Sequence, residues 1–314
     1  MWFKQFKAVF NNAFRVSAGD PFYLVISLAL AVSMMLASSM PSLGESEHLR
    51  LVRDQSHSIL FLCGGLAVIF AMIRVVTDDL RRGSGAILMS RPISGSTLIA
   101  GKFMGVLASL SLLVFTGSIA YLWISEITYS NEELNVKSLC VFVGAIFLAL
   151  AAGASRQYMY GNNYSFYSSC ALAVTLTLGF LMRLASSGKE LFDFVGLQSI
   201  AFLFLALVSF AAVVLLVAVI ADSAMTLAFS LVIFGLGLLS EYFFGRLLGG
   251  LFGDVLLSVF PNWQSFWVLE KLGLGESIPV FYFGECLVHV LLFSFVYLLL
   301  SVMVFDRSEI KGVA

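Results

Sequence analysis

Long apolar runs dominate this chain and alternate with short polar segments. Runs of about 20 apolar residues, the length that crosses a bilayer as a helix, lie at approximately 22–40, 58–76, 103–125, 136–155, 167–184, 198–221, 225–243 and 284–305. The pattern predicts an all-α polytopic membrane protein with six to eight transmembrane helices. The smaller number applies if the two runs on either side of the polar linker at 155–164 do not both cross.

The first 20 residues do not form a continuous apolar run. Their apolar side chains recur at helical spacing, while Lys4, Lys7 and Arg15 lie on the opposite side. We therefore predict an interfacial amphipathic helix over 1–20, followed by a transmembrane domain over 21–314. The alternative is that these residues are simply the exposed start of the first span. Asp20 and Pro21 supply a cap and a first-turn proline for that span.

Composition supports the membrane class and excludes several others. The chain is 60% hydrophobic and 12% charged, with a mean hydropathy of +0.98, whereas a soluble domain is about half apolar and about a quarter charged. A net charge of −1 argues against nucleic-acid binding. The four cysteines are far apart within apolar runs, so neither a disulfide framework nor a metal site is indicated.

The distribution of Lys and Arg predicts the orientation. With the amino-terminus inside and eight spans, eleven of these residues fall on the inner side and seven on the outer side. The positive-inside rule then places both the N- and the C-terminus in the cytoplasm. The bias is sharpest around the segment at 77–102, which is accordingly cytoplasmic.

That segment is longer than a turn between two spans requires. A charged helical end is followed by a glycine break at Gly83–Gly85, a short apolar element at 86–89 and a stop at Arg91–Pro92. A short helix with an apolar ridge between arginines is suited to contact a groove on a partner protein. The alternative is a solvated turn with snorkelling charges. The candidate coupling residues are Asp78, Asp79, Arg81, Arg82, Leu88, Arg91 and Pro92.

The chain carries no nucleotide-binding motif. The nearest phrase runs from Gly95 to Gly101–Lys102, but its glycine spacing differs by one from that of a phosphate loop, and Phe103 replaces the hydroxyl that would bind Mg²⁺. If ATP drives this protein, its site lies on another polypeptide.

The same segment resembles the permease subunits of ABC transporters of the ABC-2 type. In that family a charged segment after the second span leads into an L-x-S-R-P-[IV]-S-R-like phrase and then a Gly-Lys pair. The matching residues here are Leu88, Ser90, Arg91, Pro92, Ile93, Ser94, Gly101 and Lys102. Further resemblance lies at Asp222–Ser223, Pro261–Asn262 and 305–309, so that it covers most of the chain.

The sequence departs from the family pattern in three places. Gly95 stands where many members have a basic residue, and Asp78 and Asp79 stand near a position that is often Glu. The segment 136–184 resembles an extra pair of spans, which puts the family's helix numbering in doubt there.

The resemblance implies a function and a set of partners. A coupling helix within about 78–97 would sit in a cleft of a separate ABC ATPase subunit, which would bind the ATP and Mg²⁺. A second permease copy, identical or related, would complete the substrate route, with export the expected direction. The chain itself would be a transport subunit of the cell membrane, in bacteria the inner membrane, and not an enzyme. The substrate is not indicated.

Ionisable residues within spans form a second set of candidates. Glu285 and His289 are four residues apart near the outer start of the last span, and Glu241 lies near the outer end of the seventh. These three are a possible polar gate, or otherwise an inter-helix hydrogen-bond cluster. Arg74 and Arg183 lie near span ends, where they can snorkel. His48 and His57 are expected to be solvated, on or beside the first outer loop.

Between about 244 and 283 lies an outer segment that is neither a polar loop nor a clear span. Glycines repeat every four residues at Gly245, Gly249 and Gly253, and aromatic residues follow around Trp263 and Trp267. This pattern predicts short re-entrant or interfacial helices.

Two other function classes remain as alternatives. A secondary transporter or channel would work without an ATPase and would show buried charge and broken helices near mid-span. An intramembrane enzyme would need a catalytic pair in adjacent spans, and the three histidines offer little basis for one.

Overall fold

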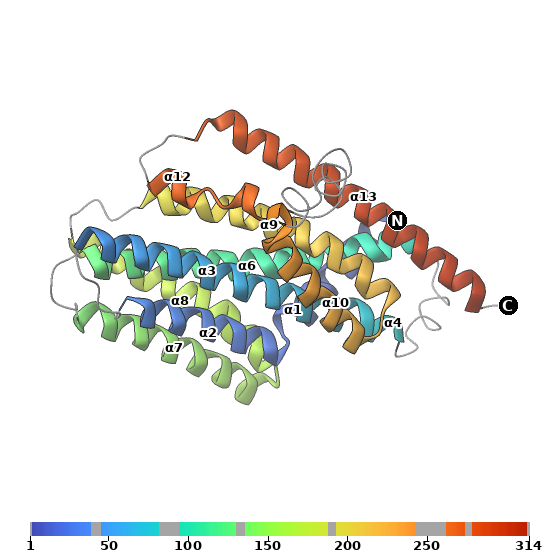
Figure 1. The fold of residues 1–314 in the computed structure, drawn as a ribbon. Coiled ribbons are helices and arrows are strands. Elements are labelled where there is room, and N and C mark those ends of the chain that lie inside the picture. The colour runs from blue at the N-terminus through green and yellow to red at the C-terminus, as the bar shows by residue number, and fades with distance from the viewer. Residues whose placement is uncertain are drawn as a thin grey trace. The chain divides into compact units, whose positions relative to one another are not determined.

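The computed structural model describes residues 2–38, 45–81, 94–129, 136–187, 193–242, 262–273 and 278–312, and these are helical nearly throughout. Figure 1 shows the helices in their order along the chain. The elements are α1 Trp2–Ala18, α2 Pro21–Ala37, α3 Glu45–Met72, η1 Ile73–Thr77, α4 Asp78–Arg81, α6 Gly95–Tyr129, α7 Val136–Tyr160, α8 Tyr164–Ser187, α9 Phe194–Ile220, α10 Ser223–Leu238, η3 Gln264–Phe266, α12 Leu269–Gly273 and α13 Val280–Gly312.

Six described helices are long and apolar enough to cross a membrane. They span Arg50–Arg81, Gly95–Ile127, Val136–Tyr160, Tyr164–Ala185, Phe194–Ile220 and Val280–Arg307. The pair α1 and α2 passes the same test only as one bent span, and α10 is a shorter apolar helix. No strand occurs in the part of the chain that the structure describes. The predicted class, an all-α multi-pass membrane protein, is confirmed.

Local signals place several helix ends. Asp20 caps α2 by accepting a hydrogen bond from the Phe22 N–H, and Pro21 occupies the first helical position, as predicted. Asp222 caps α10 in the same way by accepting from the Met225 N–H, and it lies in the short connection between α9 and α10. Gly161, between α7 and α8, has a φ of +66°, a conformation that glycine adopts without the steric cost of a Cβ.

The described residues divide into two units, and each has its own packing. The first unit comprises 1–17, 68–108 and 201–314, and the second comprises 18–67 and 109–200. In the second unit α7 and α8 pack along each other, and Trp123 of α6 contacts Phe142 and Phe180 at ring centroid distances of 5.3 and 6.4 Å. A Cβ on Gly179 would collide with Trp123, so this close packing requires the glycine.

The first unit contains an aromatic cluster at the α9–α10 pair. Phe210, Phe234 and Trp263 contact one another edge to face or tilted, and the indole N–H of Trp263 donates to the carbonyl oxygen of Phe234 at 3.1 Å. Trp263 and Phe266 are buried. They belong to the predicted outer segment, which holds the short helices η3 and α12 in its described part. Gly245, Gly249 and Gly253 lie outside the described residues.

Candidate functional site

The predicted coupling segment begins at a π turn. Residues Ile73–Thr77 form a five-residue π-helix, η1, which passes directly into α4 at Asp78–Arg81. A π turn is rare and occurs frequently at functional sites, where it widens the helix. The structure thus places Asp78, Asp79 and Arg81. The remaining coupling candidates, namely Arg82, Leu88, Arg91 and Pro92, lie outside the described residues, and their role stays a prediction.

Lys102 follows the segment, in α6, and its side chain is buried. Its Nζ donates to the backbone carbonyl oxygen of Val75 at 2.7 Å and to Oδ2 of Asp79 at 2.6 Å. Burying an ammonium group is costly unless it is paired and hydrogen-bonded, and both conditions are met here. The Asp79 side chain is 38% exposed and that of Lys102 only 5%. The ion pair therefore lies where the 77–102 segment meets its two flanking helices, with the lysine in the protein interior and the aspartate partly exposed at the surface.

Asp78 and Thr77 connect the same place to the α9–α10 hairpin. Ser223 Oγ donates to Oδ1 of Asp78 at 2.8 Å, and Thr77 Oγ1 donates to the carbonyl oxygen of Ala218 at 3.0 Å. Arg74 donates to Oδ2 of Asp78 at 3.2 Å from one helical turn away. We call the residues that meet around the π turn the η1 junction; they are Val75, Thr77, Asp78, Asp79, Lys102, Ala218 and Ser223.

Glycines at the start of α6 allow close approach by two other helices. A Cβ on Gly95 would lie against the carboxylate of Asp306 and the ring of Phe305 in α13, so α13 packs closely on the first turn of α6 at this glycine. A Cβ on Gly101 or Gly105 would meet Val9 or Ala13 of α1. The Trp2 indole N–H donates to Thr97 Oγ1 at 2.7 Å. Part of the apolar face of α1 thus packs on protein.

The possible polar gate is not assembled in this structure. Glu285 and His289 are both exposed on α13, and Glu241 is exposed just after α10. His289 stacks on Phe293 at 6.0 Å. Among the described residues, no hydrogen bond or ion pair joins these three side chains to one another. Nor does any group of three or more His, Cys, Asp or Glu there have the geometry of a metal site.

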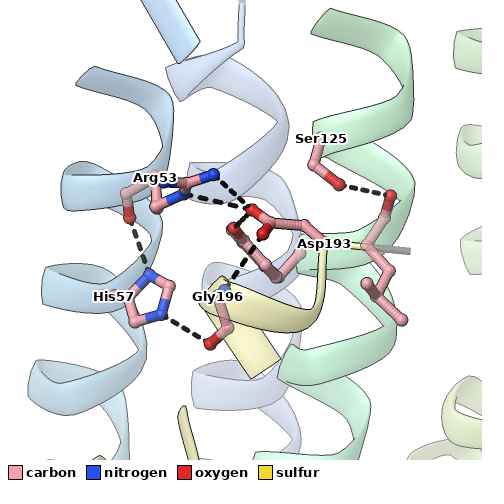
Figure 2. Close-up of polar contacts among 7 residues, drawn as sticks. Arg53, His57, Ser125, Asp193 and Gly196 are labelled. Atoms are coloured by element: carbon pink, nitrogen blue, oxygen red, sulfur yellow. Dashed lines mark hydrogen bonds and ion pairs between the residues drawn. The ribbon is translucent and has the colours of Figure 1, made fainter. Parts of the chain in front are cut away.

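A polar cluster that we did not predict lies in the second unit (Figure 2). At its centre is Asp193, immediately before α9. Its Oδ2 accepts hydrogen bonds from Arg53 Nε at 3.1 Å and Nη2 at 2.8 Å, and from the Tyr121 hydroxyl. Its Oδ1 accepts from the Gly196 N–H at 3.1 Å, which is the N-cap arrangement for α9. One carboxylate thus joins α3, α6 and the first turn of α9.

The charge of Asp193 is stabilised by these partners. Burial alone disfavours the carboxylate, but the hydrogen bonds from Tyr121 and the Gly196 N–H, together with the Arg53 guanidinium, hold the pKa of Asp193 below its usual value. Gly196 is required sterically as well, because a Cβ there would collide with Tyr121.

His57 belongs to the same cluster, and the expectation that it is solvated is wrong. Its side chain is completely buried, with a relative exposure of 0%. Nδ1 lies 2.8 Å from the carbonyl oxygen of Arg53, and Nε2 lies 3.1 Å from that of Gly196. The ring meets Tyr121 edge to face at 5.0 Å. We call Arg53, His57, Tyr121, Asp193 and Gly196 the Asp193 cluster.

Two sequence signals could have indicated this cluster. Arg53 and His57 are four residues apart, which places them on one helix face. Asp193 stands directly before an apolar run, the position of an N-cap. Their mutual contact depends on helix packing, which single-sequence patterns do not supply.

Arg183 has a partner where we expected only snorkelling. Its Nε donates to Oε1 of Glu126 at 2.9 Å, and the Glu126 side chain is 2% exposed. A buried carboxylate at a span end is stabilised by this cation, since it would otherwise be strongly unfavourable in an apolar environment. The second unit therefore contains two ion pairs close to the predicted outer ends of its helices.

These features define an α-helical multi-pass membrane protein with charged contacts at the helix ends. Comparison of the chain with protein-family models, with curated proteins and with solved structures found no match.

Proposed function

We propose that this chain is the transmembrane subunit of an ATP-driven transporter of the ABC-2 type. It would couple ATP hydrolysis by a separate ATPase subunit to movement of a substrate across the cell membrane, with export the expected direction. The resemblance at Leu88–Ser94 and Gly101–Lys102 is the starting point. The chain performs no bond chemistry in this proposal, and ATP and Mg²⁺ bind to the partner.

The observation that carries the proposal is the ion pair of Lys102 with Asp79, together with the bond from Lys102 to Val75. The two helices that flank the 77–102 segment are joined to each other where the segment begins and ends, by one buried hydrogen bond and one partly exposed ion pair. A displacement of the segment is then transmitted to both helices and not absorbed by bending between them. Such stiffness is what a coupling segment requires and what a solvated turn does not.

The η1 junction extends this transmission to a third element. Because Asp78 accepts from Ser223, and Thr77 donates to Ala218, movement of α4 also acts on the α9–α10 hairpin. The π turn at Ile73–Thr77 offers a place where α3 can change its winding. The mechanism is thus mechanical: closure of two ATPase subunits displaces the segment, and the helices attached at η1 move with it. Two permease copies would line the substrate route.

The proposed orientation follows from charge. Both termini and the 77–102 segment face the cytoplasm, by the positive-inside rule. The Asp193 cluster and the pair of Glu126 with Arg183 would then lie toward the outer side.

The direct test is recovery of the intact complex. The tagged chain is purified in mild detergent from membranes of its own cell, and the co-purifying proteins are identified and assayed for ATP hydrolysis. We expect an ATPase with a phosphate-loop motif to co-purify in stoichiometric amount. Transport by the purified chain alone, in vesicles without ATP, would exclude the proposal.

A secondary transporter or channel is the second candidate. It is favoured by the π turn inside a candidate span and by the buried side chains of Lys102 and Glu126, features that such proteins use along a substrate route. In that case ATP depletion leaves uptake or efflux by reconstituted vesicles unchanged, whereas an imposed ion gradient drives it.

A further inference from the structure

We propose that α1 is a binding site for the headgroups of anionic phospholipids, formed by the side chains of Lys4, Lys7 and Arg15. We call these three residues the α1 cation stripe. The proposal concerns the lipid next to the chain and not its cargo, so it is independent of the transport function proposed above.

The packing of α1 determines which of its faces is left for a ligand. A Cβ on Gly101 of α6 would meet the side chain of Val9, and a Cβ on Gly105 would meet Ala13, which is buried. These parts of α1 and α6 belong to the same unit. One face of α1 is thus held against α6, and a ligand can reach only the remaining faces.

The opposite face carries the charges. Lys4, Lys7 and Arg15 are all exposed, and their spacing of three and eight residues places them on one side of the helix. Exposed Asn11 lies between Lys7 and Arg15 on the same side. The sequence of α1 contains no Asp or Glu, and within the described ranges none of the three cations forms an ion pair. Three positive charges therefore stand on one face without a counter-charge from the described chain.

The part of α6 that carries α1 lies at the membrane boundary. The candidate span Gly95–Ile127 has 33 residues, a length of about 50 Å, whereas the hydrocarbon core is about 30 Å thick. The ends of this helix consequently extend into the headgroup layers. Because α1 contacts α6 between Thr97 and Gly105, near one end of that span, the α1 cation stripe lies at the depth of the lipid phosphates.

An apolar flank beside the stripe favours lipid over water or an acidic protein surface. Phe3, Phe10 and Phe14 share one side of α1 by their helical spacing. Phe3 is 69% exposed, and the other two are half-buried. A helix with aromatic residues on one side and cations next to them is suited to the boundary between headgroups and acyl chains. Lipid satisfies both sides at once, because its phosphate meets the cations and its chains cover the phenylalanines.

The charge of the stripe selects among headgroups. A zwitterionic headgroup carries its own ammonium group, which offsets the attraction of the phosphate, whereas an anionic headgroup has a net negative charge. Each Lys or Arg near an anionic surface contributes a preference of about fivefold. The α1 cation stripe therefore favours anionic phospholipids over zwitterionic ones.

The test identifies the lipid that lies against the stripe. The full chain is reconstituted in nanodiscs that contain equal amounts of phosphatidylglycerol and phosphatidylcholine, with Asn11 replaced by the photoreactive residue p-benzoylphenylalanine. The same replacement at Leu292, which is 63% exposed on α13, reports the lipid at an uncharged part of the surface. After illumination, mass spectrometry gives the ratio of the two lipids cross-linked at each position.

We expect the ratio of phosphatidylglycerol to phosphatidylcholine to be about fivefold or more higher at Asn11 than at Leu292. The difference should shrink when salt is raised from about 0.1 M to about 1 M, because the screening length falls from about 10 Å to about 3 Å.

Three variants, each carrying the photoreactive residue at position 11, assign the preference to the cations. Replacing Lys4, Lys7 and Arg15 together with glutamine should abolish the enrichment. The charge-conserving combination Lys4→Arg, Lys7→Arg and Arg15→Lys should retain it, which separates charge from any effect on folding. Lys137→Gln, at an exposed position on α7, is the control for loss of a cation elsewhere and should leave the ratio unchanged.

Three results would overturn the proposal. They are equal lipid ratios at Asn11 and Leu292, an enrichment that persists after all three cations are replaced with glutamine, and an absence of lipid cross-links at Asn11. Cross-links from Asn11 to a protein in native membranes, in place of lipid, would likewise assign the stripe to a protein partner and refute the lipid site.

Discussion

Lys102 and Asp79 are 23 residues apart in the sequence and form an ion pair, with 2.6 Å between Nζ of the lysine and Oδ2 of the aspartate. The lysine is buried and the aspartate is partly exposed, so the pair lies at the boundary between the helices and the polar segment that joins them. The position of this ion pair matters more than its strength. Because it joins α4 to α6, a partner that binds the segment between them is expected to move both helices.

Lys102→Met should uncouple the partner from the helices. The variant retains most of the side-chain volume but leaves the Val75 carbonyl without its donor, which costs about 1–3 kcal/mol of stability. In the purified complex, ATP hydrolysis should persist, whereas the increase in the hydrolysis rate that accompanies transport should fall several-fold. Thermal unfolding and ATPase assays measure the two effects. Lys137→Met, at an exposed position, is the control and should change stability by no more than about 0.5 kcal/mol. Full coupling in Lys102→Met would contradict the role of the junction.

Replacing Arg91 and Pro92 together with alanine should weaken docking of the ATPase. In the sequence these residues follow the apolar run at 86–89, and we predict that they end a short helix there, with the arginine as one of its flanking charges. We expect the variant to insert normally but to recover less ATPase on purification, or to hydrolyse ATP without transport. Arg156→Ala is a suitable control, because this exposed arginine lies in α7, outside the 77–102 segment, and packs over Tyr160 and Tyr167. Equal co-purification and coupling of both variants would count against the docking segment.

The Asp193 carboxylate should make folding stability depend on acid pH. Its pKa is lower in the folded protein than the ordinary value of 3.8. Its ionisation therefore stabilises the fold above that ordinary value, and the contribution is lost as the pH falls through the lower folded pKa. Comparing thermal unfolding of the wild type and Asp193→Asn should give a difference that is constant near neutrality and shrinks in strong acid. A difference that grows on acidification would be the wrong sign.

Gly196→Ala should be strongly destabilising although it lies in the first turn of a helix. The added Cβ would collide with Tyr121, displacing the hydroxyl that donates to Asp193. We expect a loss of about 1–3 kcal/mol, the usual cost of overpacking. Gly144→Ala, in α7 with no heavy atom near the new methyl group, should instead be neutral or favourable by up to about 1 kcal/mol, because alanine is the better helix former. Equal melting temperatures for the two variants would argue against the close approach at Gly196.

The class of fold was predictable because apolar runs and caps are local signals. The predicted run at 22–40 corresponds to α2 at Pro21–Ala37, and the predicted cap at Asp20 is present. The sites were less accessible. Lys102 was noted in the sequence only as part of a Gly-Lys pair. Its burial and its contact with Val75 depend on the π turn at Ile73–Thr77, which the hydrophobic periodicity does not predict. His57 was placed at a loop because the span was expected to begin at 58, whereas α3 starts at Glu45. Because α3 begins earlier than expected, His57 lies within the helix and is buried.

The packing of α1 on α6 has a consequence for the surrounding bilayer. Lys4, Lys7 and Arg15 are exposed on α1, and cations on such a helix are attracted to anionic headgroups. The same helix rests on Gly101 and Gly105, next to Lys102. Because Gly101 is adjacent to Lys102 of the η1 junction, we expect the charge of the lipid headgroups around α1 to affect the geometry of that junction.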